Sequence, residues 1–166
     1  MISQPVSSSN RPDNRHIRFS IDPAEVDFDQ LIDLFNRDAF WARDRARSEL
    51  ETAVARSFPV VTVWDGQTLI GFARATSDGA YRAVIWDVVV DSNYRKQGLG
   101  QKLVETLISH PDLQGVERVY LFTTHQKGFY ERIGFTANAS TTMVLMGKSL
   151  ELLLPLETNS SAPAQA

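Results

Sequence analysis

Short apolar runs and helically spaced apolar residues divide the chain into two kinds of predicted element. The short runs are bounded by turn-forming residues and predict strands. These strands are expected at residues 17–21, 60–64, 68–75, 81–90, 117–124 and 141–147. Apolar residues that recur three and four positions apart predict helices. These helices are expected from residue 28 onward, at residues 43–57, from about residue 98 to residue 110, and at residues 127–133.

Capping and turn residues set several of the predicted boundaries. Asp27 precedes a helical pattern and has a carboxylate that caps a first turn. Asp65 and Gly66 accept the positive φ of a tight turn, and they therefore predict a hairpin between the strands on either side of them. Pro59 ends the second helix and Pro111 ends the third, because proline lacks the N–H that a helix interior needs.

The order of these elements predicts a mixed α+β fold. The three strands between residues 60 and 90 follow one another directly and form an antiparallel meander. The strand–helix–strand unit that comes next has a right-handed crossover, which makes its two strands parallel neighbours or near neighbours. We expect a single domain at residues 17–154, between two tails at residues 1–16 and 155–166 whose composition is typical of disorder.

Composition narrows the function classes. A chain of 166 residues, 43% hydrophobic and 22% charged, is long enough for one well-cored domain. The net charge of −3 gives no general attraction to nucleic acid or to an anionic membrane, and the apolar runs are far shorter than the ~20 residues of a membrane helix. There is no cysteine, and the three histidines are scattered. We therefore expect a soluble protein that needs no nucleic acid, no membrane and no metal.

The stretch from Val88 to Gly100 has the sequence layout of an anion site. Three valines end a buried strand, and a basic turn with glycines then enters a helix directly. The unpaired N–H groups and the dipole of a helix start attract an anion, and Gly98 and Gly100 let a phosphate approach the backbone. Neither GK[ST] of a P-loop nor GxGxxG of a dinucleotide site is present. The alternative is a turn that binds nothing.

Two motifs together carry a family resemblance. "RKQGLG" contains Arg95, Gly98 and Gly100, follows a strand that ends in "VVV", and precedes "FYERIGF" by one strand. In order and spacing these motifs resemble the acetyl-CoA-binding core of the GNAT superfamily of N-acetyltransferases. "LIGFARATSDG", "IWDVVVD" and "THQKGFYERIGF" are further similar to cyanobacterial and plastid acetyltransferases, which include the chloroplast serotonin N-acetyltransferase. The resemblance implies a mostly antiparallel central sheet with helices on both faces and a splayed pair of parallel strands.

The resemblance also implies which residues bind acetyl-CoA, the acetyl donor. The backbone of residues 96–101 is expected to cradle the pyrophosphate, residues 88–90 to pair with the pantetheine arm, and Tyr130 to face the thioester. The implied cofactor-binding set is Val88, Val89, Val90, Arg95, Lys96, Gln97, Gly98, Leu99, Gly100, Gln101, Thr123 and Tyr130. Many relatives have an asparagine before the "FY" helix, where this chain reads "TTHQKG". There Thr123 offers a hydroxyl to the pantetheine amides, and His125 is either a second proton shuttle or a surface residue.

The chemistry of amide formation suggests roles for two side chains. The attacking amine must be neutral, although an alkyl ammonium titrates at about 10.4, so a base is useful and Asp87 is the candidate. The departing thiolate needs a proton, and the phenol of Tyr130, with a reference pKa of about 10, is the candidate acid. The N–H of Val88 or Val89 is a candidate donor to the carbonyl oxygen. Alternatively, Asp87 binds an arginine such as Arg74, and Tyr130 is a core aromatic.

Aromatic residues are the main sequence signal for the acceptor amine. Trp64 and Trp86, with Phe35, Phe40 and Trp41, occur in the segments between which the amine should enter. Aromatic walls suit an arylalkylamine such as serotonin, because they stack on its ring and attract its ammonium. The alternative is that these residues build the core, which leaves a protein lysine or an N-terminal amine as the acceptor.

Two interpretations without turnover also account for parts of the sequence. A CoA-binding regulatory module needs "RKQGLG" but does not need Tyr130 or Asp87, so the presence of both favours an enzyme. An adaptor that presents residues 43–57 to a partner needs an exposed apolar patch. We expect a cytoplasmic enzyme, or a stromal one in a photosynthetic eukaryote, whose partners are primary amines and for which a homodimer is allowed.

Overall fold

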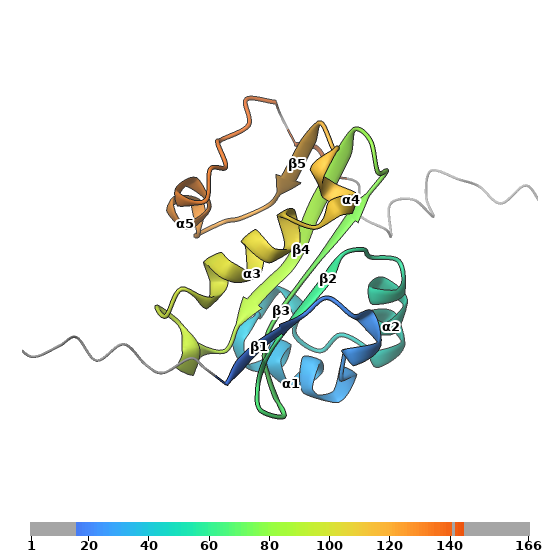
Figure 1. Cartoon of the computed structure of the whole chain (residues 1–166), viewed down its shortest axis with the longest axis vertical. Coiled ribbons are helices and arrows are strands. Elements are labelled where there is room, and N and C mark those ends of the chain that lie inside the picture. Colours follow the sequence, from blue (N-terminus) through green and yellow to red (C-terminus); the bar gives the residue numbers. More distant parts are fainter. Residues whose placement is uncertain (1–15, 141, 145–166) are drawn as a thin grey trace, which may run out of the picture. The chain divides into compact units, whose positions relative to one another are not determined.

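The computed structural model describes residues 16–140 and 142–144 of the chain (Figure 1). In chain order its elements are β1 (Ile17–Ser20), η1 (Pro23–Glu25), α1 (Phe28–Asp38), η2 (Phe40–Ala42), α2 (Arg47–Ala55), β2 (Val60–Asp65), β3 (Thr68–Ser77), β4 (Arg82–Val90), η3 (Ser92–Tyr94), α3 (Leu99–Ile108), α4 (Pro111–Gln114), β5 (Arg118–Leu121) and α5 (Lys127–Arg132). Among the described residues, none of the helices has the length and apolar character needed to cross a membrane.

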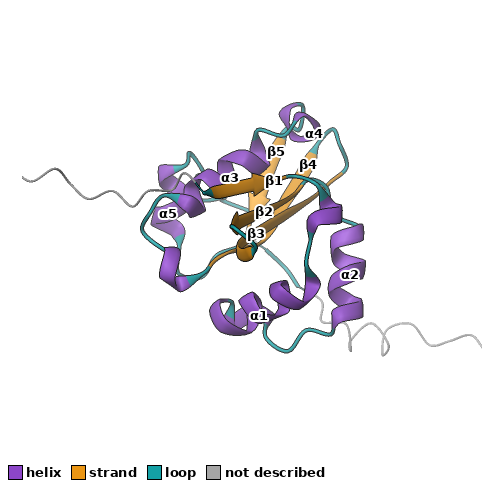
Figure 2. Ribbon diagram, turned by 60° about the horizontal axis from the view of Figure 1, so that its bottom comes forward, coloured by secondary structure: helices purple, strands orange, loops and turns teal. Residues whose placement is uncertain are grey.

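The central sheet has five strands in the order β1-β2-β3-β4-β5 (Figure 2). Strands β1 to β4 are antiparallel neighbours, whereas β4 and β5 are parallel. The chain passes from β4 to β5 through α3, as a parallel pair requires. The hairpin between β2 and β3 turns at Gly66, whose φ is 58°. The predicted α+β class, the antiparallel meander and the parallel pair are confirmed.

Helices cover both faces of this sheet (Figure 2). α1 and α2 lie on one face, where their buried side chains form one core cluster with those of the sheet. α3 packs on the other face against β2, β3 and β4, through Leu99, Leu103, Val104 and Leu107. Because β2 is covered on both sides, nearly all of its residues are buried, which explains a sequence without apolar–polar alternation.

The first helix begins where the sequence predicts, but the second does not. Asp27 caps α1, because its carboxylate accepts hydrogen bonds from two N–H groups of the first turn. α2 begins at Arg47 rather than at residue 43. Asp44 takes a left-handed φ of 58° and donates its N–H to Asn36 Oδ1 at 3.0 Å. This contact with α1 interrupts a helical pattern that is continuous in the sequence.

The chain divides after Gly134 into two compact units, and the first contains every element named above. In the second unit, Asn138 Nδ2 donates a hydrogen bond of 2.6 Å to Ser140 Oγ. Of the strand predicted at residues 141–147, residues 142–144 have no strand pairing, and the others lie outside the described residues.

The two predicted tails also fall outside the description. Residues 1–15 and 155–166 are not among the described residues, and His16 alone of the predicted N-terminal tail is described. The predicted domain boundaries at residues 17 and 154 therefore stay predictions.

Candidate active site

The parallel strands β4 and β5 separate part-way along β4. Their pairing ends at Ile85 and Leu121, so among the described strands residues 86–90 have a hydrogen-bonded neighbour only in β3. The register of β3 against β4 shifts in this stretch, and Asp87 there has a left-handed φ of 55°. An irregularity of this kind bends a strand and re-aims its side chains. Beyond the end of β5, no described strand pairs with the edge of β4 that faces away from β3, and this stretch is called the open edge of β4 below.

β4 leads through residues 91–98, called the turn below, which include the short helix η3, to the N-terminus of α3 (Figure 1). Gly98 stands at the cap position with a left-handed φ of 82°, and no side chain caps the helix. The Lys102 N–H donates to the Gly98 carbonyl at 3.1 Å. Because this bond is the first of the helix, the N–H groups of residues 99–101 have no helical acceptor, and with the helix dipole they favour an anion. A Cβ at Gly98 would meet no atom within 4 Å, so this backbone can be approached closely.

Buried carboxylates fasten the turn to α1. Asp91 follows β4 directly and accepts a hydrogen bond of 2.7 Å from Arg37 Nη2. Arg95 donates to Asp38 Oδ1 at 2.9 Å and to the Val90 carbonyl at 3.3 Å. The Asp38 side chain is only 4% exposed, so the guanidinium of Arg95 compensates a buried charge. Arg95 therefore holds the turn in place, and its direct contact with a cofactor stays a prediction.

A second anchor joins the turn to the hairpin between β2 and β3. The Tyr94 hydroxyl donates a hydrogen bond of 2.6 Å to Asp65 Oδ2. This bond to a carboxylate raises the pKa of Tyr94 above its ordinary value, because the bond stabilises the protonated phenol. The sequence does not reveal this anchor or the one at Asp38, since both partners are distant along the chain.

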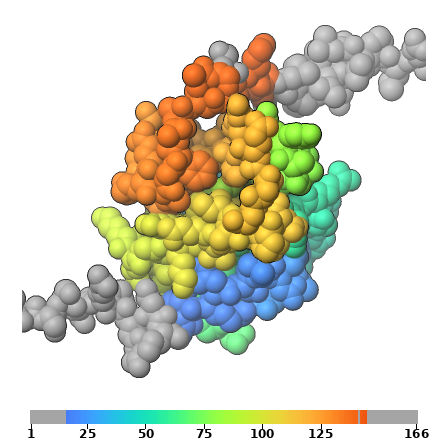
Figure 3. All heavy atoms as spheres, turned by 45° about the horizontal axis from the view of Figure 1, so that its top comes forward, coloured from blue at the N-terminus to red at the C-terminus, as the bar shows by residue number. Residues whose placement is uncertain are grey.

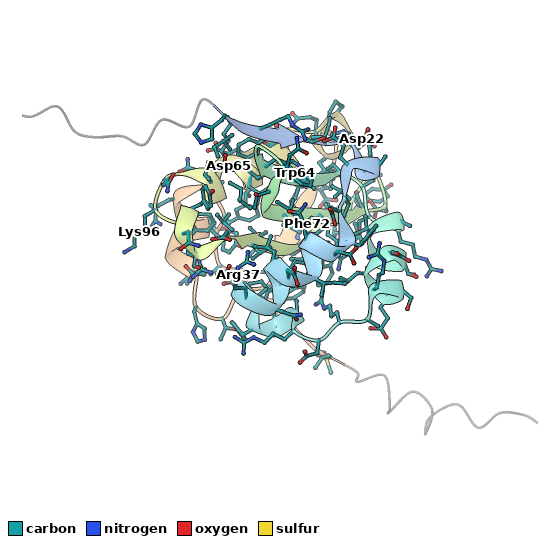
Figure 4. All side chains as sticks on the ribbon, turned by 90° about the horizontal axis from the view of Figure 1, so that it is seen from below. Asp22, Arg37, Trp64, Asp65, Phe72 and Lys96 are labelled. Atoms are coloured by element: carbon teal, nitrogen blue, oxygen red, sulfur yellow. The ribbon has the colours of Figure 1, made fainter. Side chains whose placement is uncertain are left out.

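Two polar side chains near the start of α3 point away from its first N–H groups. Lys96 projects away from the rest of the molecule (Figure 4). Gln101 donates to Glu105 Oε1 at 2.7 Å, one turn further along α3. The side chains of Lys96 and Gln101 are thus directed away from the helix start, and the predicted anion cradle of backbone N–H groups stays a prediction.

Gly100 serves a different purpose from Gly98. A Cβ at Gly100 would lie 3.5 Å from Phe129 Cζ and 3.8 Å from Val90 Cγ2, which is ordinary van der Waals contact. Apolar atoms of α5 and β4 therefore already fill the space beside Gly100. The backbone is thus more open at Gly98 than at Gly100, and the predicted contact of a phosphate with these two glycines stays a prediction.

Tyr130 lies on α5, beside the residue that contacts the start of α3. The rings of Phe129 and Tyr130 meet edge to face, with their centroids 4.9 Å apart. The atoms of α5 and α3 lie side by side at the surface in Figure 3, in agreement with the contact of Phe129 at Gly100. Burial raises the pKa of Tyr130 above its ordinary value of 10.0. The phenol therefore keeps its proton at neutral pH, as a proton donor must.

Two arginines hold the carboxylate of Asp87. Arg74 Nε donates to Oδ2 at 2.7 Å, and Arg45 Nη1 lies 3.1 Å from each of the two oxygens. The Asp87 side chain is 5% exposed. The ion pair with Arg74, one of the two alternatives in the sequence, is present. Both oxygens accept hydrogen bonds from arginine, so two guanidinium groups hold the carboxylate in one orientation.

Trp64 and Trp86 occupy different environments. Trp64 is 7% exposed, belongs to the core cluster beneath α1, and donates from Nε1 to Thr62 Oγ1 at 2.9 Å (Figure 4). The prediction that Trp64 lines an acceptor pocket is therefore wrong, because β2 is buried on both faces. Trp86 is partly exposed at the point where β4 and β5 separate, and its ring lies 5.7 Å from that of Phe122. Phe122 itself is 61% exposed.

Further exposed aromatic residues come from the segment between α1 and α2. Phe40 is 63% exposed and Trp41 46% exposed, and their rings meet edge to face. Phe40 also lies 6.4 Å, ring to ring, from His125, which is in the segment between β5 and α5. In that segment Thr123 Oγ1 accepts a hydrogen bond of 3.0 Å from the Gln126 N–H. Aromatic rings from two distant parts of the chain, the segment between α1 and α2 and the segment between β5 and α5, thus meet.

No metal centre accompanies these residues. Within the described part of the chain, no three or more histidine, aspartate or glutamate residues are grouped so that they could hold a metal ion.

Comparison with known proteins identifies the fold family. The sequence profile of the acetyltransferase (GNAT) family matches residues 28–135, which is more than half of the chain. The chain belongs to the GNAT family. The match runs from α1 to just beyond α5, and it therefore includes every element of the site described above.

Named relatives in the GNAT family include plant proteins. GCN5-related N-acetyltransferase 1, chloroplastic, of Arabidopsis thaliana is 33% identical over 114 residues, which cover 68% of this chain and 58% of that protein. Serotonin N-acetyltransferase 2, chloroplastic, of Oryza sativa subsp. japonica is 34% identical over 116 residues, which cover 66% and 56%. The chain thus spans little more than half the length of these relatives.

A solved GNAT-family structure agrees with the fold. The protein from Xanthomonas campestris pv. campestris has a TM-score of 0.71 and 28% sequence identity, and the match covers 78% of this chain and 94% of that one. The predicted membership of the GNAT superfamily is therefore confirmed by sequence and by structure.

Two substitutions before α3 test whether CoA binding depends on the open backbone at Gly98 or on the charge of Lys96. Gly98→Val places a branched Cβ where the backbone is open and at a φ of 82° that disfavours it. Lys96→Ala removes one solvent-exposed charge and leaves the backbone unchanged. We expect the glycine variant to weaken CoA binding at least about tenfold and the lysine variant to weaken it only about twofold, as measured by titration calorimetry.

Gly100→Ala is the matched control for Gly98→Val, since its added Cβ fits against Phe129 without meeting the helix N–H groups. We expect this variant to bind CoA almost as the parent does. Equal losses in the Gly98 and Lys96 variants would contradict the backbone cradle.

Proposed function

We propose that this chain is an acetyl-CoA-dependent N-acetyltransferase that transfers an acetyl group to a primary amine, and that the amine is an arylalkylamine. The observation that supports it best is the continuity of β4 with α3. The open edge of β4 leads within a few residues to uncapped N–H groups at the start of a helix. Amine-dependent release of CoA from acetyl-CoA tests the proposal.

The two parts of this site suit the two parts of the donor. In this proposal the N–H groups of residues 99–101 bind the pyrophosphate, and the edge of residues 88–90 that has no described strand beside it pairs with the amides of the pantetheine arm. Because β4 runs directly into the turn, one molecule that binds both parts has its thioester end near the bulge at Asp87. Acetyl-CoA supplies the activated acyl group.

Tyr130 is proposed as the proton donor of the reaction. A neutral amine forms a C–N bond to the acyl carbon, the C–S bond breaks, and the departing sulfur takes the phenolic proton. The raised pKa of Tyr130 keeps that proton on the phenol until it is needed. Water then restores the proton of Tyr130, and the proton lost by the amine leaves to solvent.

The role of Asp87 in this proposal is to position its neighbours. Both carboxylate oxygens accept hydrogen bonds from arginine side chains, so in this proposal Asp87 orients these side chains and a water accepts the proton of the amine. The base role stays a prediction.

The acceptor is proposed to be aromatic because exposed and partly exposed rings lie at the end of β5 and on the segment between α1 and α2. Trp86 and Phe122 lie where β4 and β5 separate, and Phe40 and Trp41 lie on the segment between α1 and α2. Rings of this kind bind an aryl group by stacking and attract an ammonium. The rice relative is named a serotonin N-acetyltransferase, and both plant relatives are named chloroplastic, which supports an arylalkylamine and a plastid location as proposals for this chain.

Replacing Trp86 tests the aromatic acceptor. We expect wild type to acetylate tryptamine with a higher kcat/KM than an aliphatic amine of similar size, by about fivefold, since stacking contributes roughly 1 kcal/mol. Trp86→Ala removes this preference, because it removes the partly exposed ring at the separation of β4 and β5. Steady-state kinetics with the two amines measure it.

Trp64→Ala is the control for Trp86→Ala. Trp64 is a core residue, so its loss lowers the free energy of unfolding by about 3 kcal/mol and leaves the ratio between the two amines unchanged. If Trp86→Ala kept the full preference for tryptamine, the acceptor site would lie elsewhere, and a preference of the wild type for lysine peptides would indicate a protein substrate.

A further inference from the structure

Arg45 has a guanidinium group that is fixed beside Asp87, at the bulge of β4, and that has further donors. Its planar group lies over the ring of Phe35, with 5.7 Å between the guanidinium carbon and the ring centroid. Its Nη1 group lies 3.1 Å from both oxygens of Asp87. One face and one nitrogen are therefore occupied, and the orientation of the group is set before any ligand arrives.

The backbone before Arg45 fixes it as well. Asp44 has a left-handed φ of 58°, and its N–H is bonded to Asn36 Oδ1 at 3.0 Å. Arg45 then follows directly, two residues before α2 begins. The interrupted helix described above is thus what turns Arg45 toward Asp87.

The remaining donors of Arg45 are available. Its Nε and Nη2 groups make no hydrogen bond to another described residue, and the side chain is 32% exposed. By contrast, Arg74 is 14% exposed and divides its donors between Asp87 and Ser57. A guanidinium has a planar fork of N–H groups that suits a carboxylate, so the free edge of Arg45 has the chemistry of a carboxylate site.

The local charge balance favours an anion. Two guanidinium groups, of Arg45 and Arg74, meet one carboxylate, that of Asp87, which leaves one positive charge without a partner in the cluster. The partial burial of the cluster reduces screening by water. An acceptor with a second cationic group is repelled here, and one with an anionic group is attracted.

We propose that Arg45 binds a carboxylate of the acceptor, so that among acceptors of the proposed aromatic class those that also have a carboxylate are preferred. The proposal rests on the proposed acetyltransferase function and names the substrate class of the same site. The carboxylate comes either from a free amino acid or from an acidic residue next to the amine of a peptide. Polyamines and basic peptides are poor acceptors for the same reason.

Tryptophan and tryptamine test the first source, since they differ by one carboxylate. The measured quantity is the kcat/KM for tryptophan divided by that for tryptamine. In Arg45→Gln this ratio falls about tenfold or more relative to wild type, as expected for the loss of a charge-assisted hydrogen bond. The different basicities of the two amines cancel, because each substrate is compared with itself across the variants. Arg45→Lys keeps the charge without the fork and gives an intermediate ratio.

Arg43→Gln is the matched control. Arg43 is an exposed arginine of the same segment, and the change leaves the ratio as in wild type. For the peptide source, the same variants are compared on peptides that begin Ala-Asp and Ala-Asn. A carboxylate preference that depends on Arg45 in either pair of acceptors supports the proposal.

The proposal and the function on which it rests fail differently. If amines are acetylated but Arg45→Gln changes no carboxylate preference in either pair, the carboxylate site is wrong and the acetyltransferase stands. If the folded protein binds acetyl-CoA and acetylates none of these acceptors, the proposed function is wrong.

Discussion

Tyr130→Phe is expected to lower kcat by about 100-fold while the affinity for acetyl-CoA hardly changes. The variant keeps the ring and its edge-to-face contact with Phe129, and it removes only the hydroxyl. Without that proton donor, the thiolate must leave unprotonated. Steady-state kinetics at saturating amine, together with calorimetric titration of CoA, measure the two quantities separately.

A donor with a better leaving group provides the control for Tyr130→Phe. With an acyl donor whose leaving group needs no proton, the deficit of the variant shrinks toward zero. An unchanged kcat in a wild type limited by chemistry would return Tyr130 to a packing role.

The assignment of Tyr130 as proton donor also predicts how kcat depends on pH. Burial raises the pKa of Tyr130 above 10.0, and the protonated phenol is the active form. The contribution of Tyr130 is therefore fully present at neutral pH and is lost only as the pH rises through a value above 10.0. A decrease of kcat at a lower pH has another origin, and the Tyr130→Phe variant would show the same decrease.

The second large effect is expected on stability when Asp87 is removed. Asp87→Ala leaves the guanidinium groups of Arg45 and Arg74 without their shared, 5% exposed counter-charge. We expect the free energy of unfolding to fall by about 3 kcal/mol, the lower part of the range for breaking a buried pair, because Arg45 is itself partly exposed. Urea denaturation monitored by circular dichroism measures it.

Glu51→Ala is the matched control for Asp87→Ala. Its carboxylate pairs with Arg47 on the exposed face of α2, so its loss costs less than about 0.5 kcal/mol. If the two variants were equally stable, the cluster at Asp87 would contribute no more than a surface pair.

The enzymatic role of Asp87 is decided by Asp87→Asn, which keeps the shape of the side chain. In a positioning role, the variant raises KM for the amine and keeps the acidic limb of the pH profile of kcat/KM. If Asp87 were the base, the variant would lose that limb and most of kcat.

Local chemistry predicts the parts of this fold that depend on neighbours in the sequence. The cap at Asp27, the hairpin turn at Gly66 and the crossover through α3 follow from residue types a few positions apart, and the structure has all three. The start of α3 after Gly98, without a side-chain cap, is of the same kind, because it follows from the glycine-containing turn in the sequence.

Long-range contacts determine what the sequence does not show. α2 begins late because Asp44 bonds to Asn36 of the preceding helix. Gly100 faces Phe129, which is brought over it by the crossover, and Arg45 reaches Asp87 across 42 positions of the chain. The sequence wrongly predicts a pocket position for Trp64 for a similar reason. An apolar strand has the same sequence pattern whether its second face packs against a helix or lines a pocket.

The most direct test of the account is acetyl transfer by the purified chain. Acetyl-CoA is incubated with arylalkylamines, amino acids, polyamines, lysine peptides and peptides with free N-termini, and both released CoA and acetylated product are quantified. We expect an N-acetylated aromatic amine in a one-to-one ratio with CoA, at a rate that Tyr130→Phe lowers about 100-fold. Tight binding of acetyl-CoA without transfer to any of these amines would contradict an acetyltransferase and indicate a CoA-binding module instead.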